Sequence, residues 1–173
     1  MKYSSDLAYP KIEVEKENKE YAKLLLSAYS GRNSETTAIF EYIYQSIILD
    51  NKYGEILKNI AIVEMKHLNI LGQTIKLLGL DPMYIYPNNI DNGFKYWNSS
   101  YVDYNNNLIH IISSNINDEK MAINNYNEII NKIDDKYVIE ILKRLVLDEE
   151  IHLKILKNIQ NELNFQNFNI DNS

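Results

Sequence analysis

Two Glu-x-x-His motifs, each set in an apolar stretch, constrain this sequence more than any other feature. Glu64 and His67 form the first motif, and Glu149 and His152 form the second. Three residues is close to one helical turn, so on a helix each pair projects from a single face. Leucines and isoleucines recur at helical spacing on that same face in both stretches. Because buried charged groups are costly unless they are paired, these side chains predict a shared partner.

A second pair of motifs indicates an internal repeat. Glu35 and Glu119 each begin the pattern Glu-x-x-Ala-Ile-x-x-Tyr, which ends at Tyr42 in the first copy and at Tyr126 in the second. Each of these glutamates also precedes a Glu-x-x-His motif by nearly the same number of residues. The sequence therefore has the form of two copies of one helix pair.

The hydrophobic periodicity predicts an all-α fold. We expect an extended N-terminal arm at 1–14, a four-helix bundle over 15–164 and a flexible tail at 165–173. The helices should span about 15–49, with Gly31 tolerated inside, then about 52–78, 105–132 and 135–164.

The connections between the helices predict how they are arranged. Asp50-Asn51 is a turn whose residues can cap the second helix, Gly79 ends that helix, and Asp135 caps the fourth. Short connections make each helix pair antiparallel. The aromatic-rich connection at 81–104 is long enough to run the length of a bundle. The sequence thus predicts an antiparallel four-helix bundle with one long crossover between the second and third helices.

Composition excludes several classes of function. The net charge is −6 with acids and bases mixed, so binding to nucleic acid or to an anionic membrane is disfavoured. There is no cysteine, which removes disulfides, thiolate metal sites and iron–sulfur clusters. The opening residues lack the apolar core of a signal peptide, and no apolar run approaches the roughly 18 residues of a membrane span. We therefore expect a cytoplasmic protein with no membrane partner.

Facing inward, the helices would bring four carboxylates and two imidazoles together. Two divalent cations would neutralise the four negative charges and remove the cost of burying them. Oxygen-rich ligation with one imidazole for each metal suits iron or manganese better than structural zinc.

These motifs resemble those of the ferritin-like superfamily, over nearly all four helices. The string Glu64-Met65-Lys66-His67, with its counterparts, is similar to bacterioferritin and rubrerythrin, whose bundles hold paired metals. The Tyr9-Pro10 leader and the Glu119-Lys120 start resemble small manganese catalases. The resemblance implies two divalent transition-metal ions as cofactors and a homo-oligomer.

Carried over by position, the resemblance makes the four glutamates catalytic and gives six metal ligands: Glu35, Glu64, His67, Glu119, Glu149 and His152. Glu64 and Glu149 would bridge the metals, although the second such glutamate is not a direct ligand in manganese catalases. Tyr42 and Tyr126 would hydrogen-bond the opposite lone glutamate. Bacterioferritins place an acid just before each Glu-x-x-His motif, and here Asp148 fills one such place and would orient His67. Val63 fills the other, so what holds His152 stays open.

Two residues near these motifs are given lesser roles. Met65 matches a haem ligand of bacterioferritins, but a lone methionine on a helix usually packs, so we expect no haem. His110, the third histidine, is expected to be an ordinary surface or core residue.

Three functions follow from the resemblance. The first is a di-metal oxidoreductase acting on hydrogen peroxide or dioxygen, with catalase- or peroxidase-like detoxification. The second is ferroxidase activity with iron storage, for which ferrous iron is the substrate. The third is a structural or coat component in which the metal site braces the bundle. A four-cysteine rubredoxin iron site, as in rubrerythrins proper, is ruled out by the absence of cysteine. Catalase chemistry needs no such electron donor, which favours the first function.

Overall fold

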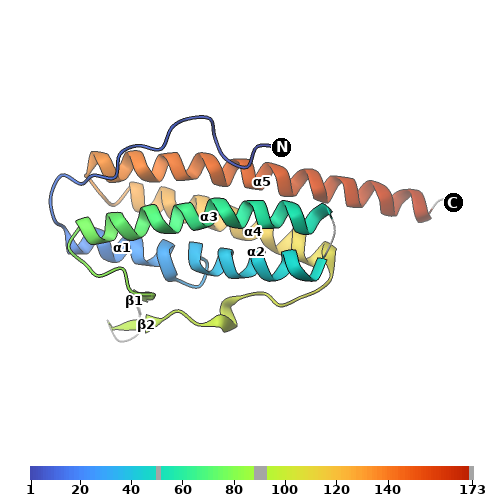
Figure 1. Ribbon diagram of the computed structural model, residues 1–173, viewed down its shortest axis with the longest axis horizontal. Coiled ribbons are helices and arrows are strands. Elements are labelled where there is room, and N and C mark those ends of the chain that lie inside the picture. Colours follow the sequence, from blue (N-terminus) through green and yellow to red (C-terminus); the bar gives the residue numbers. More distant parts are fainter. Residues whose placement is uncertain (50–51, 88–92, 172–173) are drawn as a thin grey trace.

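The computed structural model describes residues 1–49, 52–87 and 93–171, most of which are helical. Its helices are α1 (Lys19–Ser30), α2 (Glu35–Leu49), α3 (Lys52–Leu77), α4 (Leu108–Ile130) and α5 (Lys136–Asp171). α2 packs against α3 and α4 packs against α5, with α1 beside α3 in line with α2. Figure 1 shows these helices running along one long axis. The predicted all-α bundle with one long crossover is confirmed, and the crossover lies between α3 and α4.

The bundle buries two apolar clusters rather than one. The first lies around α1, the C-terminal part of α3 and the N-terminal part of α5, and includes Leu71 and Leu142. The second lies around α2, the start of α3 and the later turns of α5, and includes Leu57 and Leu156. Along α3 and α5, the Glu-x-x-His motifs fall between the residues of the two clusters. A polar layer therefore divides the apolar core.

The first predicted helix, 15–49, is wrong, because two helices meet there. α1 ends at Gly31, and its terminal carbonyl groups are bonded by hydroxyl groups of the next segment. Thr36 Oγ1 donates to the Tyr29 carbonyl at 2.7 Å, and Thr37 Oγ1 donates to the Gly31 carbonyl at 3.2 Å. These bonds replace the helical bonds that the break removes. The break also places Glu35 in the first turn of α2, where the helix dipole favours a negative charge.

Side-chain caps set the other helix boundaries. Asn18 caps α1 and Asn107 caps α4, so both helices begin later than predicted. Asp135 Oδ1 accepts hydrogen bonds from the backbone of Tyr137 and Val138 at 3.0 and 3.2 Å, which confirms the predicted cap of the last helix. The predicted turn at 50–51 lies outside the described residues.

The last helix is longer than expected. α5 continues past the predicted end at Asn164 as far as Asp171. In Figure 1 it extends beyond the ends of the other helices. Helix therefore occupies most of the segment 165–173 for which a tail was predicted.

The crossover contains secondary structure that its sequence did not predict. β1 (Ile85–Pro87) pairs with β2 (Phe94–Tyr96) in an antiparallel hairpin, with Tyr86 opposite Lys95. A short 3₁₀ helix, η1 (Ser99–Tyr101), follows. Figure 1 shows the crossover and the N-terminal arm on opposite sides of the bundle.

Aromatic side chains attach the crossover to the helices. The Trp97 ring stacks on Phe40 with centroids 4.9 Å apart, and its Nε1 donates to Thr37 Oγ1 at 2.9 Å. Tyr84 stacks on Tyr29 at 5.4 Å. These contacts attach the connection to α1 and α2, on the side of the bundle where α2 carries Glu35.

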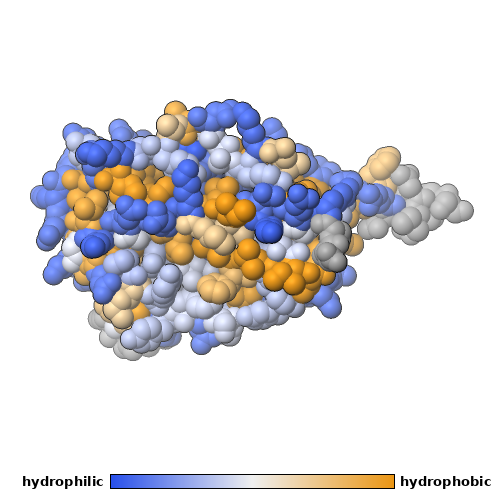
Figure 2. Space-filling model, viewed as in Figure 1, coloured by the Kyte–Doolittle hydropathy of each residue, from blue (hydrophilic) through white to orange (hydrophobic). Residues whose placement is uncertain are grey.

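The surface combines charged residues with several apolar ones. Figure 2 shows apolar residues gathered in patches on one face. Among the exposed large apolar side chains are Phe40, Ile47 and Ile62, with exposures of 54%, 70% and 53%. Within the described ranges, no helix is both long enough and apolar enough to cross a membrane.

Gly79 ends α3, as the sequence predicts, through a specific backbone geometry. Its φ of 92° lies in the left-handed region. Its N–H donates to the Lys76 carbonyl at 3.0 Å, and the Leu80 N–H donates to the Ile75 carbonyl at 3.2 Å. This pair of bonds is a Schellman motif, which favours glycine because it lacks a Cβ.

We expect Gly79→Ala to lower the free energy of unfolding by ~1–2 kcal/mol, the cost of holding an L-residue in the left-handed region. Urea unfolding followed by circular dichroism measures it. Lys76→Ala, an exposed change in the same helix end, is the control. An equal loss in both variants would contradict the role assigned to the glycine.

Candidate metal centre

Six buried side chains from four helices meet at the polar layer. α2 provides one of them, α3 two, α4 one and α5 two, and none is more than 4% exposed. They are the six residues selected from the sequence: Glu35, Glu64, His67, Glu119, Glu149 and His152. The structure therefore brings together every predicted ligand. These residues form two neighbouring groups, and in each group the potential ligand atoms lie within 4.8 Å of one another, close enough to hold one metal ion.

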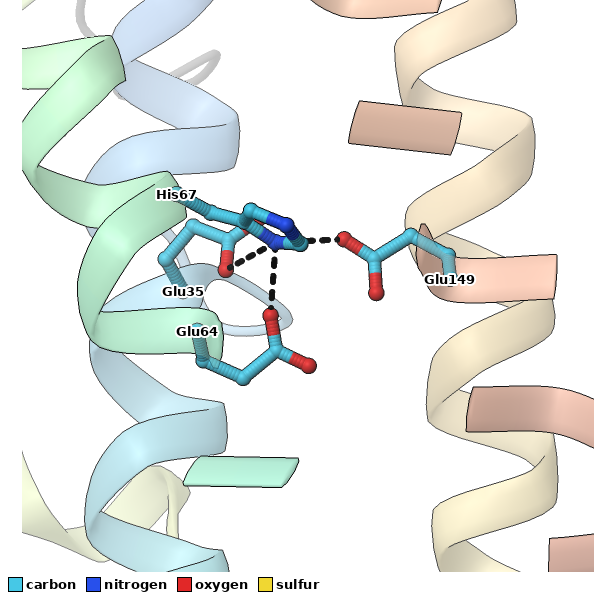
Figure 3. Close-up of side chains that lie close together, drawn as sticks. All are labelled: Glu35, Glu64, His67 and Glu149. Atoms are coloured by element: carbon cyan, nitrogen blue, oxygen red, sulfur yellow. Dashed lines mark ion pairs between the residues drawn. The ribbon is translucent and has the colours of Figure 1, made fainter. Parts of the chain in front are cut away.

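The first group surrounds Nδ1 of His67 (Figure 3). This nitrogen lies 2.8 Å from Glu64 Oε2, 3.1 Å from Glu149 Oε1 and 3.6 Å from Glu35 Oε2. Three carboxylate oxygens and one imidazole nitrogen thus converge on one point between α2, α3 and α5.

The second group repeats this arrangement around Nδ1 of His152. That nitrogen lies 2.8 Å from Glu64 Oε1, 3.1 Å from Glu149 Oε2 and 3.8 Å from Glu119 Oε1. Glu64 and Glu149 each direct one oxygen to one histidine and the other oxygen to the second histidine. Both glutamates are therefore placed to bridge two ions, whereas Glu35 and Glu119 each face only one group.

Several of these atoms lack a hydrogen-bond partner, which tests whether a cation fits. Among the described residues, the buried side-chain atoms without a bond are both oxygens of Glu64, Glu149 Oε1 and His67 Nδ1. His67 Nδ1 is close to carboxylate oxygens but not in hydrogen-bond geometry with them. Unpaired buried polar atoms are rare and costly. A donor set of carboxylate oxygens with one imidazole for each position fits a divalent transition metal.

The outer nitrogen of each histidine is held by a different kind of group. His67 Nε2 lies 3.0 Å from Asp148 Oδ2, the contact predicted from the sequence. His152 Nε2 lies 2.9 Å from the backbone carbonyl of Tyr3, in the N-terminal arm. The sequence left open which group holds His152, and the structure shows that it is the Tyr3 carbonyl. Such outer partners fix which ring nitrogen faces the metal.

The two repeat tyrosines bond the lone glutamates across the site, as predicted. Tyr42 donates from its hydroxyl to Glu119, and Tyr126 donates to Glu35. Each tyrosine is on the helix of one lone glutamate and bonds the other. These exchanged bonds join α2 to α4 and hold the two terminal carboxylates in place.

Burial and the neighbouring charges together raise the pKa values of both lone glutamates and of His67. Burial, followed by the charges of Glu64 and Glu149, raises the pKa of Glu35 well above its usual value. Burial also raises the pKa of Glu119, to about 8. Burial lowers the pKa of His67, but the carboxylates of Glu149 and Glu64 outweigh it and raise that pKa well above 6.5. The cluster therefore holds more negative charge than a buried site tolerates, which a pair of cations would offset.

A cavity of about 390 Å³ leads to the carboxylates from the crossover side. The four cluster glutamates line it, together with Tyr42 and Tyr126 and with residues of the crossover, but neither cluster histidine does. Ala38 and Ala122, the small residues of the repeat motif, also line it. The cluster is thus open to small molecules on its carboxylate side and backed by the arm on its histidine side.

The remaining candidates from the sequence lie away from the cluster. His110 is half-exposed and pairs with Asp103 at 2.6 Å. Met65 is 43% exposed on the surface of α3.

Several contributors to the site were missed in the sequence, among them Arg144, the Tyr3 carbonyl, the Tyr9 hydroxyl and Glu41. Arg144 is buried and its Nη1 lies 2.6 Å from Asp148 Oδ1. Its spacing of one helical turn before Asp148 was a signal that could have been used. No sequence signal marks the Tyr3 carbonyl, because every residue has the same backbone carbonyl group.

The comparisons with known proteins agree with this geometry. The family profile described as rubrerythrin matches residues 23–160. A probable manganese catalase of Clostridium acetobutylicum is 26% identical over 182 residues, which cover 92% of this chain and 79% of that protein.

Solved structures show the same fold. KatB, a manganese catalase from Anabaena, superposes with a TM-score of 0.82 and 22% identity, over 95% of this chain and 81% of that one. The bacterioferritin of Desulfovibrio desulfuricans gives a TM-score of 0.70 and 23% identity, over 84% of this chain and 80% of that one. These likenesses confirm a ferritin-like fold.

The matched segment includes the four helices' cluster residues and well over half of the sequence. This chain therefore belongs to the rubrerythrin family, within the ferritin-like superfamily of di-metal carboxylate proteins.

Proposed function

We propose that this protein is a di-metal oxidoreductase that converts two molecules of hydrogen peroxide into dioxygen and two of water. The observation that carries the proposal is the pair of ligand groups that share Glu64 and Glu149 and open onto a cavity. A shared pair of metal positions suits a two-electron reaction. The likeness to a probable manganese catalase supports the same chemistry.

The residues that would hold the ions follow from the two groups. Glu35 and His67 would serve one ion, Glu119 and His152 the other, and the two remaining glutamates would bridge them. When bound, the two ions, manganese or iron, supply a store for the electron pair that passes from one peroxide to the next. We infer that the four glutamates, which line the cavity, are the groups that meet the substrate.

The chain itself orients these groups and handles protons. The hydroxyls of Tyr42 and Tyr126 fix the terminal carboxylates, and the two apolar clusters flank the polar layer along the bundle. The first peroxide gives up two protons with its two electrons, and the second takes up both. Glu41 lines the cavity outside the ligand set, so its carboxylate is placed to accept and return a proton.

The absence of cysteine fits this reaction better than peroxide reduction. No thiolate iron site can supply electrons within the chain. In the catalase reaction, peroxide is both the reductant and the oxidant, so no electron donor is needed.

Iron oxidation is the second candidate, and one observation favours it. Three acidic side chains outside the cluster, Glu41, Asp103 and Asp118, line the cavity. Negative charge along an entry path raises the local concentration of cations such as ferrous iron. Storage would further require a large hollow homo-oligomer. The exposed apolar side chains, such as Phe40, Ile47 and Ile62, could form contacts between its subunits. A purely structural brace is disfavoured, since a brace needs no cavity at its carboxylates.

The main test measures oxygen evolved from peroxide without added reductant, using protein purified with its native metals. We expect steady oxygen evolution and two metal ions for each chain by elemental analysis. Loading of far more iron than two ions, in a large particle on a sizing column, would instead support iron storage. If neither behaviour is seen and chelation lowers the free energy of unfolding, only the structural brace would remain.

Removing a bridging carboxylate should empty the centre. We expect Glu64→Ala and Glu149→Ala to lose paired metal binding and oxygen evolution while the helical circular dichroism signal remains. The physical reason is that each bridge contributes to both metal positions. Glu140→Ala, which removes an exposed glutamate from α5, is the matched control. Two bound ions in both bridge variants would contradict the ligand assignment.

The pKa of Glu41 allows a further prediction. Burial, followed by the charges of Asp118 and Asp103, raises this pKa to about 7 from 4.5. The folded state therefore binds more protons than the unfolded state between these values, so stability falls as pH rises toward and through 7. A neutral glutamine avoids that loss.

We expect Glu41→Gln to raise the free energy of unfolding at pH 8 by up to ~3 kcal/mol and to change it little at pH 5, where Glu41 is already protonated. The variant should keep both metals but lose about 10²-fold in peroxide turnover, because it cannot accept a proton. Urea unfolding at the two pH values, metal analysis and oxygen evolution measure these effects. Full turnover in a metal-loaded variant would refute the proton role.

A further inference from the structure

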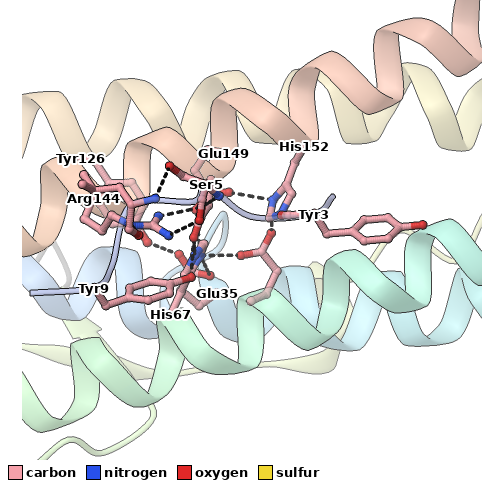
Figure 4. Close-up of polar contacts among 12 residues, drawn as sticks. Tyr3, Ser5, Tyr9, Glu35, His67, Tyr126, Arg144, Glu149 and His152 are labelled. Atoms are coloured by element: carbon pink, nitrogen blue, oxygen red, sulfur yellow. Dashed lines mark hydrogen bonds and ion pairs between the residues drawn. The ribbon is translucent and has the colours of Figure 1, made fainter. Parts of the chain in front are cut away.

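The N-terminal arm lies behind the two cluster histidines, on the side away from the cavity. Figure 4 shows its residues beside His67 and His152. The Tyr3 carbonyl contacts His152 Nε2 directly at 2.9 Å. Toward His67 the arm acts through Asp148, whose Oδ1 accepts the Ser5 backbone N–H at 2.7 Å.

Asp148 is held by groups from both the arm and α5. Arg144 Nη1 donates to its Oδ1 at 2.6 Å, and the Tyr9 hydroxyl donates to its Oδ2, which also contacts His67. Arg144 further donates to the carbonyls of Leu7 at 2.6 Å and Ser5 at 3.1 Å. The carboxylate behind His67 is therefore fully bonded, and it does not depend on Tyr3.

The two histidines are thus backed by groups of different charge. A carbonyl can only accept a hydrogen bond, so His152 Nε2 must carry the proton, which leaves the lone pair on Nδ1 in the neutral ring. Asp148 holds His67 Nε2 in the same way, but as a carboxylate, although paired with Arg144, it polarises the ring more than a neutral carbonyl does, which makes the ring a stronger donor to a metal. His152 receives the same orientation without that carboxylate.

The sequence repeat shows why this difference arises. Asp148 precedes Glu149, and the corresponding position before Glu64 holds Val63. Arg144 likewise corresponds to Asn59. The first half of the repeat lacks both the carboxylate and the guanidinium that would back His152, and the arm carbonyl takes their place.

We propose that Tyr3 is a positioning residue whose backbone carbonyl holds His152, and that the position formed by Glu119 and His152 is consequently the weaker of the two metal positions. The arm therefore governs how readily that one ion binds and leaves. This inference rests on the proposed two-metal centre and specifies which of its halves is exchangeable.

The test compares two deletions in the full chain. Deleting Lys2 to Ser4, between Met1 and Ser5, removes the Tyr3 carbonyl but leaves Ser5 and Tyr9 on Asp148. Deleting Lys2 alone is the matched control, since both chains lose the exposed ion pair of Lys2 with Asp6. Chelator-treated proteins are titrated with MnCl₂ by calorimetry. Paramagnetic resonance distinguishes an isolated Mn²⁺ from a coupled pair.

In the control we expect two binding steps, the second weaker than the first. In the longer deletion the second step should weaken by about 10–100-fold while the first is unchanged. At intermediate MnCl₂ the deletion variant should show the signal of an isolated ion where the control shows a coupled pair. Circular dichroism checks that both proteins are folded.

Val63→Asp in the deleted chain separates the hydrogen bond from the packing of the Tyr3 ring. By the repeat, an aspartate there is placed to accept from His152 as Asp148 does from His67, so the second step should recover most of its loss. No recovery in a folded variant would contradict the hydrogen-bond role. Equal binding in both deletions would overturn this inference alone, whereas a full chain that binds no pair of ions would overturn the proposed centre as well.

Discussion

The mutual burial of four carboxylates and two imidazoles between two apolar clusters is the constraint on which the structure depends. Each group on its own would be costly to bury, and several of their atoms have no hydrogen-bond partner among the described residues. The helices can place these groups together only if something compensates the excess negative charge. Protonation can do so in part, as the raised pKa values of Glu35 and Glu119 indicate. Two cations would do so fully, which couples metal binding to the stability of the bundle.

The centre has two chemically different sides. Its carboxylates open to the cavity beneath the crossover, while its histidines are closed off by the arm and by α5. Small molecules can therefore reach the carboxylate oxygens without contacting the histidine nitrogens. The aromatic contacts of Trp97 and Tyr84 matter for this reason, because they hold the crossover against α1 and α2 beside the cavity.

The two halves of the repeat are alike at the cluster and differ behind it. The exchanged bonds of Tyr42 and Tyr126 are equivalent, and each bridging glutamate divides its oxygens between the two histidines. The groups behind the histidines break this symmetry, with a buried Arg144–Asp148 pair on one side and a peptide carbonyl on the other. In the cavity, Glu41 of one half corresponds to Asn125 of the other. A duplicated framework can thus surround its two buried histidines with different groups.

The sequence by itself determined the helices, their antiparallel pairing and the six residues of the cluster. It could do so because helical spacing shows which side chains share a face, and because a charged group on an apolar face requires a partner. The roles of Tyr42, Tyr126 and Asp148 came instead from the resemblance to ferritin-like proteins, and the structure shows the contacts that it implied. Helical periodicity failed at Gly31, because one glycine in a periodic stretch does not reveal that Thr36 and Thr37 will bond the freed carbonyls.

Only the tertiary structure decided what lies behind His152, how the crossover folds and where the cavity opens. The Tyr3 carbonyl is a backbone atom, so no residue type marks its role. The hairpin at β1 and β2 and the cavity beside the alanines depend on segments that meet only after the chain has folded. Such contacts join residues far apart in sequence, and local periodicity carries no information about them.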